Sequence, residues 1–153
     1  MVGITPGDEK RLSDSTKEML HDRQIQTLYD ALEADNIDFA VQVIGSIGDS
    51  KNLRAVGPLT VLLEYPDEAI QASSALALGK IGDKEAIQPL VDALGKTSDK
   101  VKISIVTALG TFGDKSVIRA IESILLTPDE PRLTNVVRKT VYHLNHPDSI
   151  EKV

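Results

Sequence analysis

Cysteine and tryptophan are absent from this 153-residue sequence, and aromatic residues make up only 3% of it. Without cysteine the chain has no disulfide, no thiolate nucleophile and no cysteine-containing metal site, and its composition fits a reducing compartment. Because aromatics are so few, the 41% of hydrophobic residues consists mainly of Ala, Leu, Ile and Val. Small aliphatic side chains of this kind favour closely packed helices over a β-sandwich core.

Long apolar runs are missing as well. No stretch approaches the roughly 18 apolar residues of a membrane span, and the polar segment 1–10 lacks the apolar core of a signal peptide. These features predict a cytoplasmic protein that does not enter a membrane, and residues 1–12 are expected to form a disordered tail. The net charge of −6 repels nucleic acids on average, so nucleic acid is not the expected partner.

What the sequence does contain is an internal repeat, whose copies begin at Ile25, Val56, Ile87 and Ile118 and are therefore evenly spaced. The segment Ile87 to Leu94 matches the segment Ile25 to Leu32 at six of eight positions. In each copy apolar residues follow the spacing of one face of an amphipathic helix. The four apolar columns are Ile25/Val56/Ile87/Ile118, Leu28/Leu59/Leu90/Ile121, Ala31/Leu62/Ala93/Ile124 and Leu32/Leu63/Leu94/Leu125.

Another helix is predicted before each of these. Apolar residues recur at helical spacing from Ile70 to Ile81 and again from Val101 to Phe112. We call this the first helix of a unit and the helix of the four columns the second helix. A Gly-Asp pair separates the two, at residues 48–49, 82–83 and 113–114. Glycine tolerates the left-handed conformation that ends a helix, and Asp49, Asp83 and Asp114 are expected to cap the next one.

The motif Leu-Gly-x-Ile/Phe-Gly-Asp, at residues 78–83 and 109–114 and in weaker form at 44–49, resembles the short HEAT-like repeat. This repeat type is also found in phycobilin lyases, and the resemblance covers residues 25–145. It implies an all-α fold, a right-handed α-solenoid (superhelix) of about four HEAT-like helical hairpins. First helices would form the convex face and second helices the concave face. The resemblance implies no particular activity, because one fold serves many functions.

The repeat predicts one HEAT-like repeat domain over 13–153, with units at 13–35, 36–66, 67–97, 98–127 and a partial unit at 128–153. Extra residues in the turn 50–55 and the linker 127–134 interrupt the even spacing. If the longer linker 127–134 shifts the last helix, Leu144 takes the position that Leu109 has in the preceding first helix. His143 is then expected at the position of Ala108. Because Ile150 and Val153 follow an unpaired last helix, we expect self-association through the ends of the solenoid.

The outward positions of the second helices are candidates for binding a partner. They include five acidic residues and one basic residue, so an acidic concave face is expected, with a basic peptide or protein surface as its partner. The alternative interpretation is that these charges only keep the helices in solution. The candidate residues are Gln26, Tyr29, Asp30, Glu33, Glu64, Gln88, Val91, Asp92, Arg119 and Glu122.

The other groups of polar, glycine and basic residues in the sequence predict no catalytic, cofactor or metal site. His143, His146 and Asp148 lie close in sequence, but two His and one Asp at a chain end rarely complete a coordination shell. The glycines at 79, 82, 110 and 113 lack the preceding strand and following Lys of a phosphate-binding loop. The basic group Lys100, Lys102, Arg138 and Lys139 has no interleaved aromatics for base stacking and is interpreted as a solvated face.

The leading functional hypothesis is therefore a non-enzymatic protein–protein interaction or scaffold module. A tetrapyrrole (phycobilin)-lyase-like subunit is the alternative that the resemblance leaves open, and retention of a pigment would distinguish it. A nucleic-acid-binding helical repeat is a third class, which salt-sensitive binding to DNA or RNA would reveal.

Overall fold

The computed structural model describes residues 14–126 and 130–148, and within them it contains helices joined by turns and no strand, as predicted for an all-α fold. The expected tail 1–12 and the residues Ile150 and Val153 lie outside the described residues. The elements are α1 (Asp14–Glu33), α2 (Ile37–Asp49), η2 (Leu53–Ala55), α3 (Val56–Leu62), α4 (Glu68–Ile81), η3 (Lys84–Ala86), α5 (Ile87–Leu94), α6 (Asp99–Thr111), η4 (Lys115–Val117), α7 (Ile118–Ser123), η5 (Ile124–Leu126) and α8 (Pro131–Asn145).

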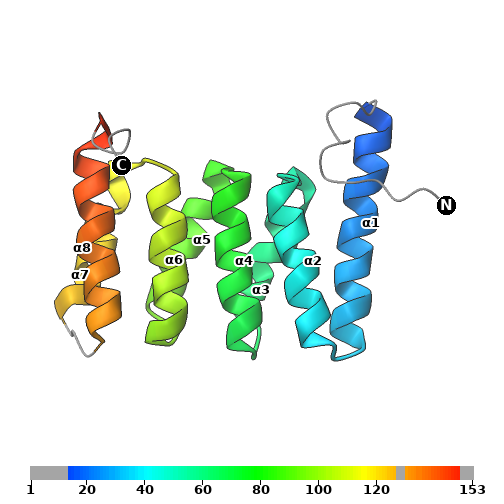
Figure 1. Cartoon of the computed structure of the whole chain (residues 1–153), viewed down its shortest axis with the longest axis horizontal. Coiled ribbons are helices and arrows are strands. Elements are labelled where there is room, and N and C mark those ends of the chain that lie inside the picture. Colours follow the sequence, from blue (N-terminus) through cyan, green and yellow to red (C-terminus); the bar gives the residue numbers. More distant parts are fainter. Residues whose placement is uncertain (1–13, 127–129, 149–153) are drawn as a thin grey trace.

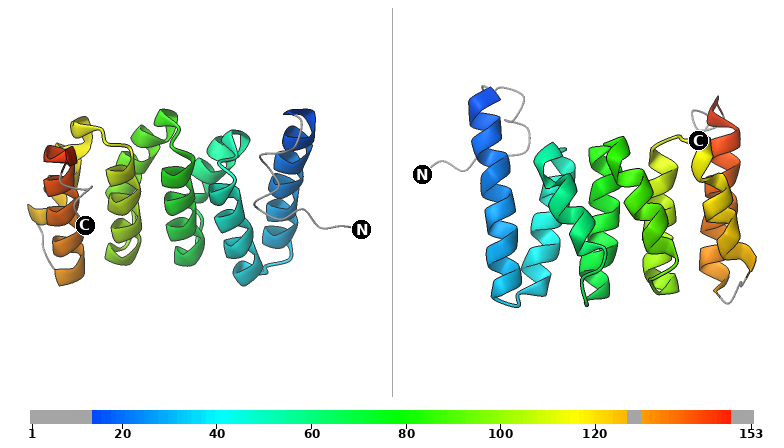
Figure 2. Two further views of the ribbon diagram at one scale, coloured as in Figure 1. Left: turned by 45° about the horizontal axis from the view of Figure 1, so that its top comes forward. Right: turned by 180° about the vertical axis from the view of Figure 1, so that it is seen from behind.

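The helices form an elongated stack of two layers. The first helices α2, α4, α6 and α8 stand side by side in one row, with α1 beyond α2 at the end (Figure 1). The short second helices α3, α5 and α7 lie behind this row, as the reverse view shows (Figure 2). Each second helix packs against the first helix that follows it, and each first helix packs against the next. This neighbour-to-neighbour packing is that of a solenoid.

The predicted apolar columns form the core. Leu28, Leu59, Leu90 and Ile121, which share one column, are all fully buried. Burial of one such side chain contributes about 1.5–3 kcal/mol relative to leaving it in water. On the first helices, the predicted stripes are also buried, including Ile70, Leu78, Val101, Ile105 and Leu109. The repeat pattern therefore identified the side chains that join consecutive units.

Two of the three predicted Gly-Asp turns are confirmed. Gly82 ends α4 and Gly113 follows α6, with φ angles of 74° and 66° in the left-handed region that favours glycine. Asp83 accepts a hydrogen bond from the backbone N–H of Glu85 (3.0 Å), and Asp114 accepts one from Ser116 (2.8 Å). Hydrogen bonding from Ser116 lowers the pKa of the Asp114 carboxyl, because it favours the charged form.

The prediction for Gly48 and Asp49 was wrong. Gly48 is buried inside α2, and Asp49 is the last residue of that helix rather than the cap of the next one. Its carboxylate instead accepts a hydrogen bond from Lys80 Nζ at 2.8 Å. The reason is the longer turn after residue 49, which moves the start of η2 to Leu53. Asn52 caps η2 there, with its side-chain oxygen 3.1 Å from the N–H of Arg54.

Asn52 also connects this turn to α1. Its side chain is completely buried, and its amide donates to the backbone oxygen of His21 (3.0 Å) and to Gln24 Oε1 (3.1 Å). Next to it, Arg54 Nη1 contacts both carboxylate oxygens of Asp22, at 2.7 and 2.8 Å. The extra residues of this turn thus form a polar attachment for the terminal helix, which sequence reasoning treated only as added length.

We expect Asn52→Ala to lower the free energy of unfolding by about 1–3 kcal/mol, since it leaves buried hydrogen-bonding groups without a partner. Urea denaturation followed by circular dichroism measures the change. Asn135→Ala is the matched control, because Asn135 is exposed on α8 and surface substitutions usually change stability by less than about 0.5 kcal/mol. Equal effects of the two substitutions would contradict a structural role for Asn52.

The position predicted for His143 was also wrong. A Cβ built on Gly79 would lie 3.0 Å from the Cα of Ala108, and one built on Gly110 would lie 2.8 Å from Cγ2 of Thr140. Thr140, rather than His143, therefore occupies the place of Ala108. Leu133 and Val137 are buried at the positions that correspond to Val101 and Ile105 in the same register. This register continues the buried stripe of α6 along α8.

Candidate functional site

The ten predicted binding residues lie on the surface, on α1 and on or just after α3, α5 and α7. We call this set the second-helix face. Nine of its members are exposed and Val91 is half-buried. The set is Gln26, Tyr29, Asp30, Glu33, Glu64, Gln88, Val91, Asp92, Arg119 and Glu122.

The structure brings part of this set together. Lys96 Nζ lies 3.1 Å from Glu64 Oε1, which joins the segment after α3 to the segment after α5. Val91 lines a hollow of about 290 Å³ together with Ala120 and Ser123 of α7. The members on α1 lie at the end of the stack, because α1 packs against α2 and η2. The members on or just after α3, α5 and α7 thus belong to neighbouring units, and the members on α1 lie at the end of the stack.

Hydrogen bonds within single helices repeat on this face. Gln26 Nε2 donates to Asp30 Oδ1 (2.9 Å), and Gln88 Nε2 donates to Asp92 Oδ1 (2.8 Å) at the equivalent positions of a later unit. A neutral amide leaves the carboxylate charge in place. The ion pair with Lys96, in contrast, neutralises the charge of Glu64. Sequence reasoning missed this partner because Lys96 lies outside the four columns. The face remains acidic after this correction.

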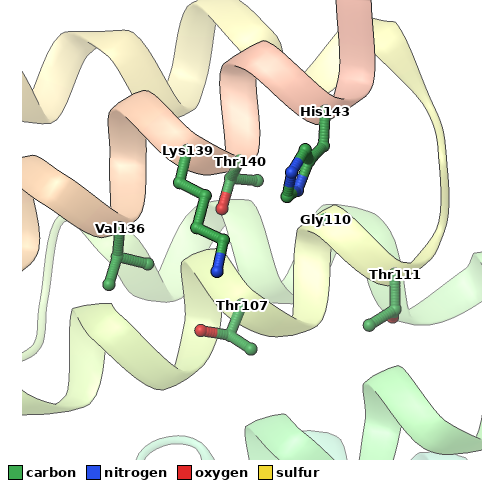
Figure 3. Close-up of a pocket in the computed structure, with 7 residues that line it drawn as sticks. All are labelled: Thr107, Gly110, Thr111, Val136, Lys139, Thr140 and His143. Atoms are coloured by element: carbon green, nitrogen blue, oxygen red, sulfur yellow. The ribbon is translucent and has the colours of Figure 1, made fainter. Parts of the chain in front are cut away.

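The opposite side of the stack carries a groove that sequence reasoning did not identify. A hollow of about 440 Å³ lies between α6 and α8, where Lys139 and His143 extend from α8 toward Thr107 and Gly110 of α6 (Figure 3). A second hollow of about 350 Å³ spans α2, α4 and α6. Thr107 and Thr111 line both hollows. The two hollows therefore adjoin, and we call them together the first-helix groove.

Small side chains explain why this side is hollowed. At the closest approaches, Gly48 faces Ala77, Gly79 faces Ala108 and Gly110 faces Thr140. The first helices pack directly against one another, whereas the second helices pack mainly against first helices. The first helices therefore form the more closely packed layer of the stack.

The histidines near the C-terminal end lie on either side of the Tyr142 ring, which meets the ring of His143 edge-on with 6.0 Å between centroids. His143 lines the first-helix groove, and the ring of His146 stacks on Tyr142 with 4.5 Å between ring centroids. Within residues 14–126 and 130–148, no three His, Asp or Glu side chains are grouped so that they could hold a metal ion. None of the helices described there combines the length and hydropathy needed to cross a membrane.

Comparison with known proteins identifies the repeat. The family model described as HEAT repeats matches residues 25–104, which include the columns from Ile25 to Leu94 and the helices α2 to α5. No curated protein matches the chain at a significant level.

Proposed function

The chain belongs to the HEAT-repeat family, and we propose that it is a non-enzymatic scaffold that binds a basic protein surface through its second-helix face. Stacked helical repeats build extended binding surfaces, and HEAT repeats commonly mediate protein–protein interaction. The proposed scaffold is a right-handed superhelix of about four hairpins within one domain. Its proposed contact residues are the ten that define the second-helix face.

The observation that carries this proposal is the exposed excess of carboxylates on that face. Asp30, Glu33, Asp92 and Glu122 are all exposed, and none makes an ion pair with another described residue. Facing charges of opposite sign steer a partner to the surface and select against partners of the wrong sign. Tyr29 and Val91 add apolar contact area beside the charges, which a purely solvating surface does not need.

Charge reversal on this face tests the proposal. We expect a random-peptide library to yield Lys- and Arg-rich ligands for the protein. The double variant Asp92→Lys/Glu122→Lys should bind these peptides roughly tenfold more weakly or worse, since both substitutions place like charges opposite the ligand. Fluorescence anisotropy of a labelled selected peptide measures the affinity. The affinity should also fall as salt is added, because the charges are exposed.

Asp38→Lys/Glu68→Lys is the matched control. It makes the same change in net charge at exposed positions on the first helices α2 and α4. A general electrostatic attraction would weaken equally in both double variants, and that result would refute a site on the second-helix face. Failure to select any basic peptide would refute it too.

A further inference from the structure

We propose that the first-helix groove is a second binding site, which takes an acidic segment of a partner protein carrying an apolar anchor residue. This site lies on the other layer of the stack from the second-helix face. Its ligand would be acidic, whereas the ligand of the second-helix face would be basic. The inference therefore does not depend on the function proposed above.

The apolar part of the groove lies at α2 and α4. Val41, Leu76, Ala77 and Ala108 line the hollow of about 350 Å³ there, and Leu76 is 40% exposed at its surface. Lys80 is the charged residue of this lining, and its Nζ is already held by Asp49. Ligand pockets occupy about 300–1,000 Å³ and are mainly apolar with a few polar groups. This hollow therefore suits an aliphatic or aromatic side chain better than a charged one.

The charged part of the groove lies at α8. Lys139 and His143, one helical turn apart on that helix, both reach into the hollow of about 440 Å³ (Figure 3). Neither forms an ion pair with the described residues, and no Asp or Glu lines either hollow. The hydroxyls of Thr107 and Thr111 donate to backbone carbonyls within α6. Lys139 and His143 are thus the groups available to receive a carboxylate.

The spacing of the helices sets the length of the ligand. Neighbouring packed helices lie about 8–10 Å apart, so α2 to α8 spans roughly 24–30 Å. An extended chain covers about 3.3 Å per residue, which corresponds to roughly eight residues. Leu76 on α4 and Lys139 on α8 are separated by two such intervals. An apolar anchor and a carboxylate about five or six residues apart would therefore reach both.

A nucleic acid fits this groove poorly, because the ammonium group of Lys139 neutralises few phosphates and no Phe, Tyr or Trp among the described residues lines either hollow for base stacking. A peptide carboxylate needs only one or two charge-assisted contacts. The charge and the apolar lining together favour the acidic segment.

The same random-peptide library tests the inference. Ligands of the first-helix groove should combine Asp or Glu with an apolar residue about five or six positions away. A labelled peptide of this class should bind roughly tenfold more weakly to Lys139→Glu and to Leu76→Glu. Lys115→Glu, which makes the same charge change on η4, should bind it normally. Lys139→Met keeps the aliphatic stem and should also weaken binding, and the far-UV circular dichroism of every variant should match that of the parent protein.

The two proposals fail separately in this experiment. Equal affinity of Lys139→Glu and Lys115→Glu, or absence of acidic ligands, would overturn the groove while leaving the basic ligands of the second-helix face intact. Binding of nucleic acid that is lost in Lys139→Glu would overturn the peptide assignment. So would a concentration-dependent increase in mass by light scattering that Lys139→Glu abolishes, because the occupant would then be a second copy of the chain.

Discussion

Leu90→Ala should lower the free energy of unfolding by about 2–5 kcal/mol, the cost of opening a cavity in a packed core. Leu90 is completely buried in α5 and belongs to the column that also contains Leu28, Leu59 and Ile121. Domains of ordinary size have a total stability of about 5–15 kcal/mol, so this one change removes a large fraction of it. Each unit of a solenoid contacts only its neighbours, and Leu90 is in a central unit with a neighbour on both sides.

Leu53→Ala provides the control with identical chemistry. Leu53 is 62% exposed on η2, and the same side-chain atoms are removed there from a largely solvated position. We expect its effect to stay within about 0.5 kcal/mol. Denaturant unfolding followed by circular dichroism compares the two variants. Similar losses in both would mean that the buried columns do not hold consecutive units together.

The columns were predictable because helical periodicity and the internal repeat report the same physical fact. A helix in a stack has one side without water, and that side must be apolar in every unit. Leu28, Leu59, Leu90 and Ile121 satisfy this rule without reference to any neighbour. Gly82 and Gly113 were predictable for a similarly local reason, since a left-handed residue after a helix is most often glycine.

The details that depend on how units meet were not predictable in this way. Asp49 follows a glycine, as Asp83 and Asp114 do, yet the longer turn after it gives the capping role to Asn52. The extra length was visible in the sequence, but the attachment of Asn52 to His21 and Gln24 on α1 depends on tertiary packing. The register of α8 against α6 is likewise set by contacts across the linker.

For the candidate surfaces too, features set within one unit were predictable and features set by contacts between units were not. Exposure of the second-helix face follows from the buried columns, because residues on the far side of the same helices must face water. The ion pair between Glu64 and Lys96 joins two units, and the sequence pattern of one unit does not contain it. The first-helix groove was missed because it is hollowed out by small residues such as Gly45, Ser73 and Thr107, and only the packing of α6 against α8 places Lys139 and His143 beside them.

Gly79→Leu should destabilise the protein by about 3 kcal/mol, the upper part of the range for overpacking. A Cβ at this position would lie 3.0 Å from both the Cα and the Cβ of Ala108 and 3.1 Å from Thr111 Oγ1. Thr111 Oγ1 also lies 3.1 Å from the backbone oxygen of Gly79, so its single proton is shared between this contact, which joins α6 to α4, and the 2.6 Å hydrogen bond to Ala108 within α6. A larger side chain must therefore push two helix backbones apart and break the contact between them.

Intrinsic helix propensity would raise the stability of the Gly79→Leu variant, whereas overpacking lowers it. The sign of the measured change therefore shows which effect dominates. Leu is a better helix former than Gly by roughly 0.8 kcal/mol, so the substitution would stabilise α4 if packing were indifferent. Gly45→Leu in α2 is the matched control, because a Cβ there meets no atom within 4 Å and the adjoining hollow has room for the side chain. Thermal and urea unfolding should show a loss for Gly79→Leu and no loss for Gly45→Leu. If both variants gain stability, the close approach of α4 and α6 is not what holds the first helices together, and the groove built on that approach loses its structural basis.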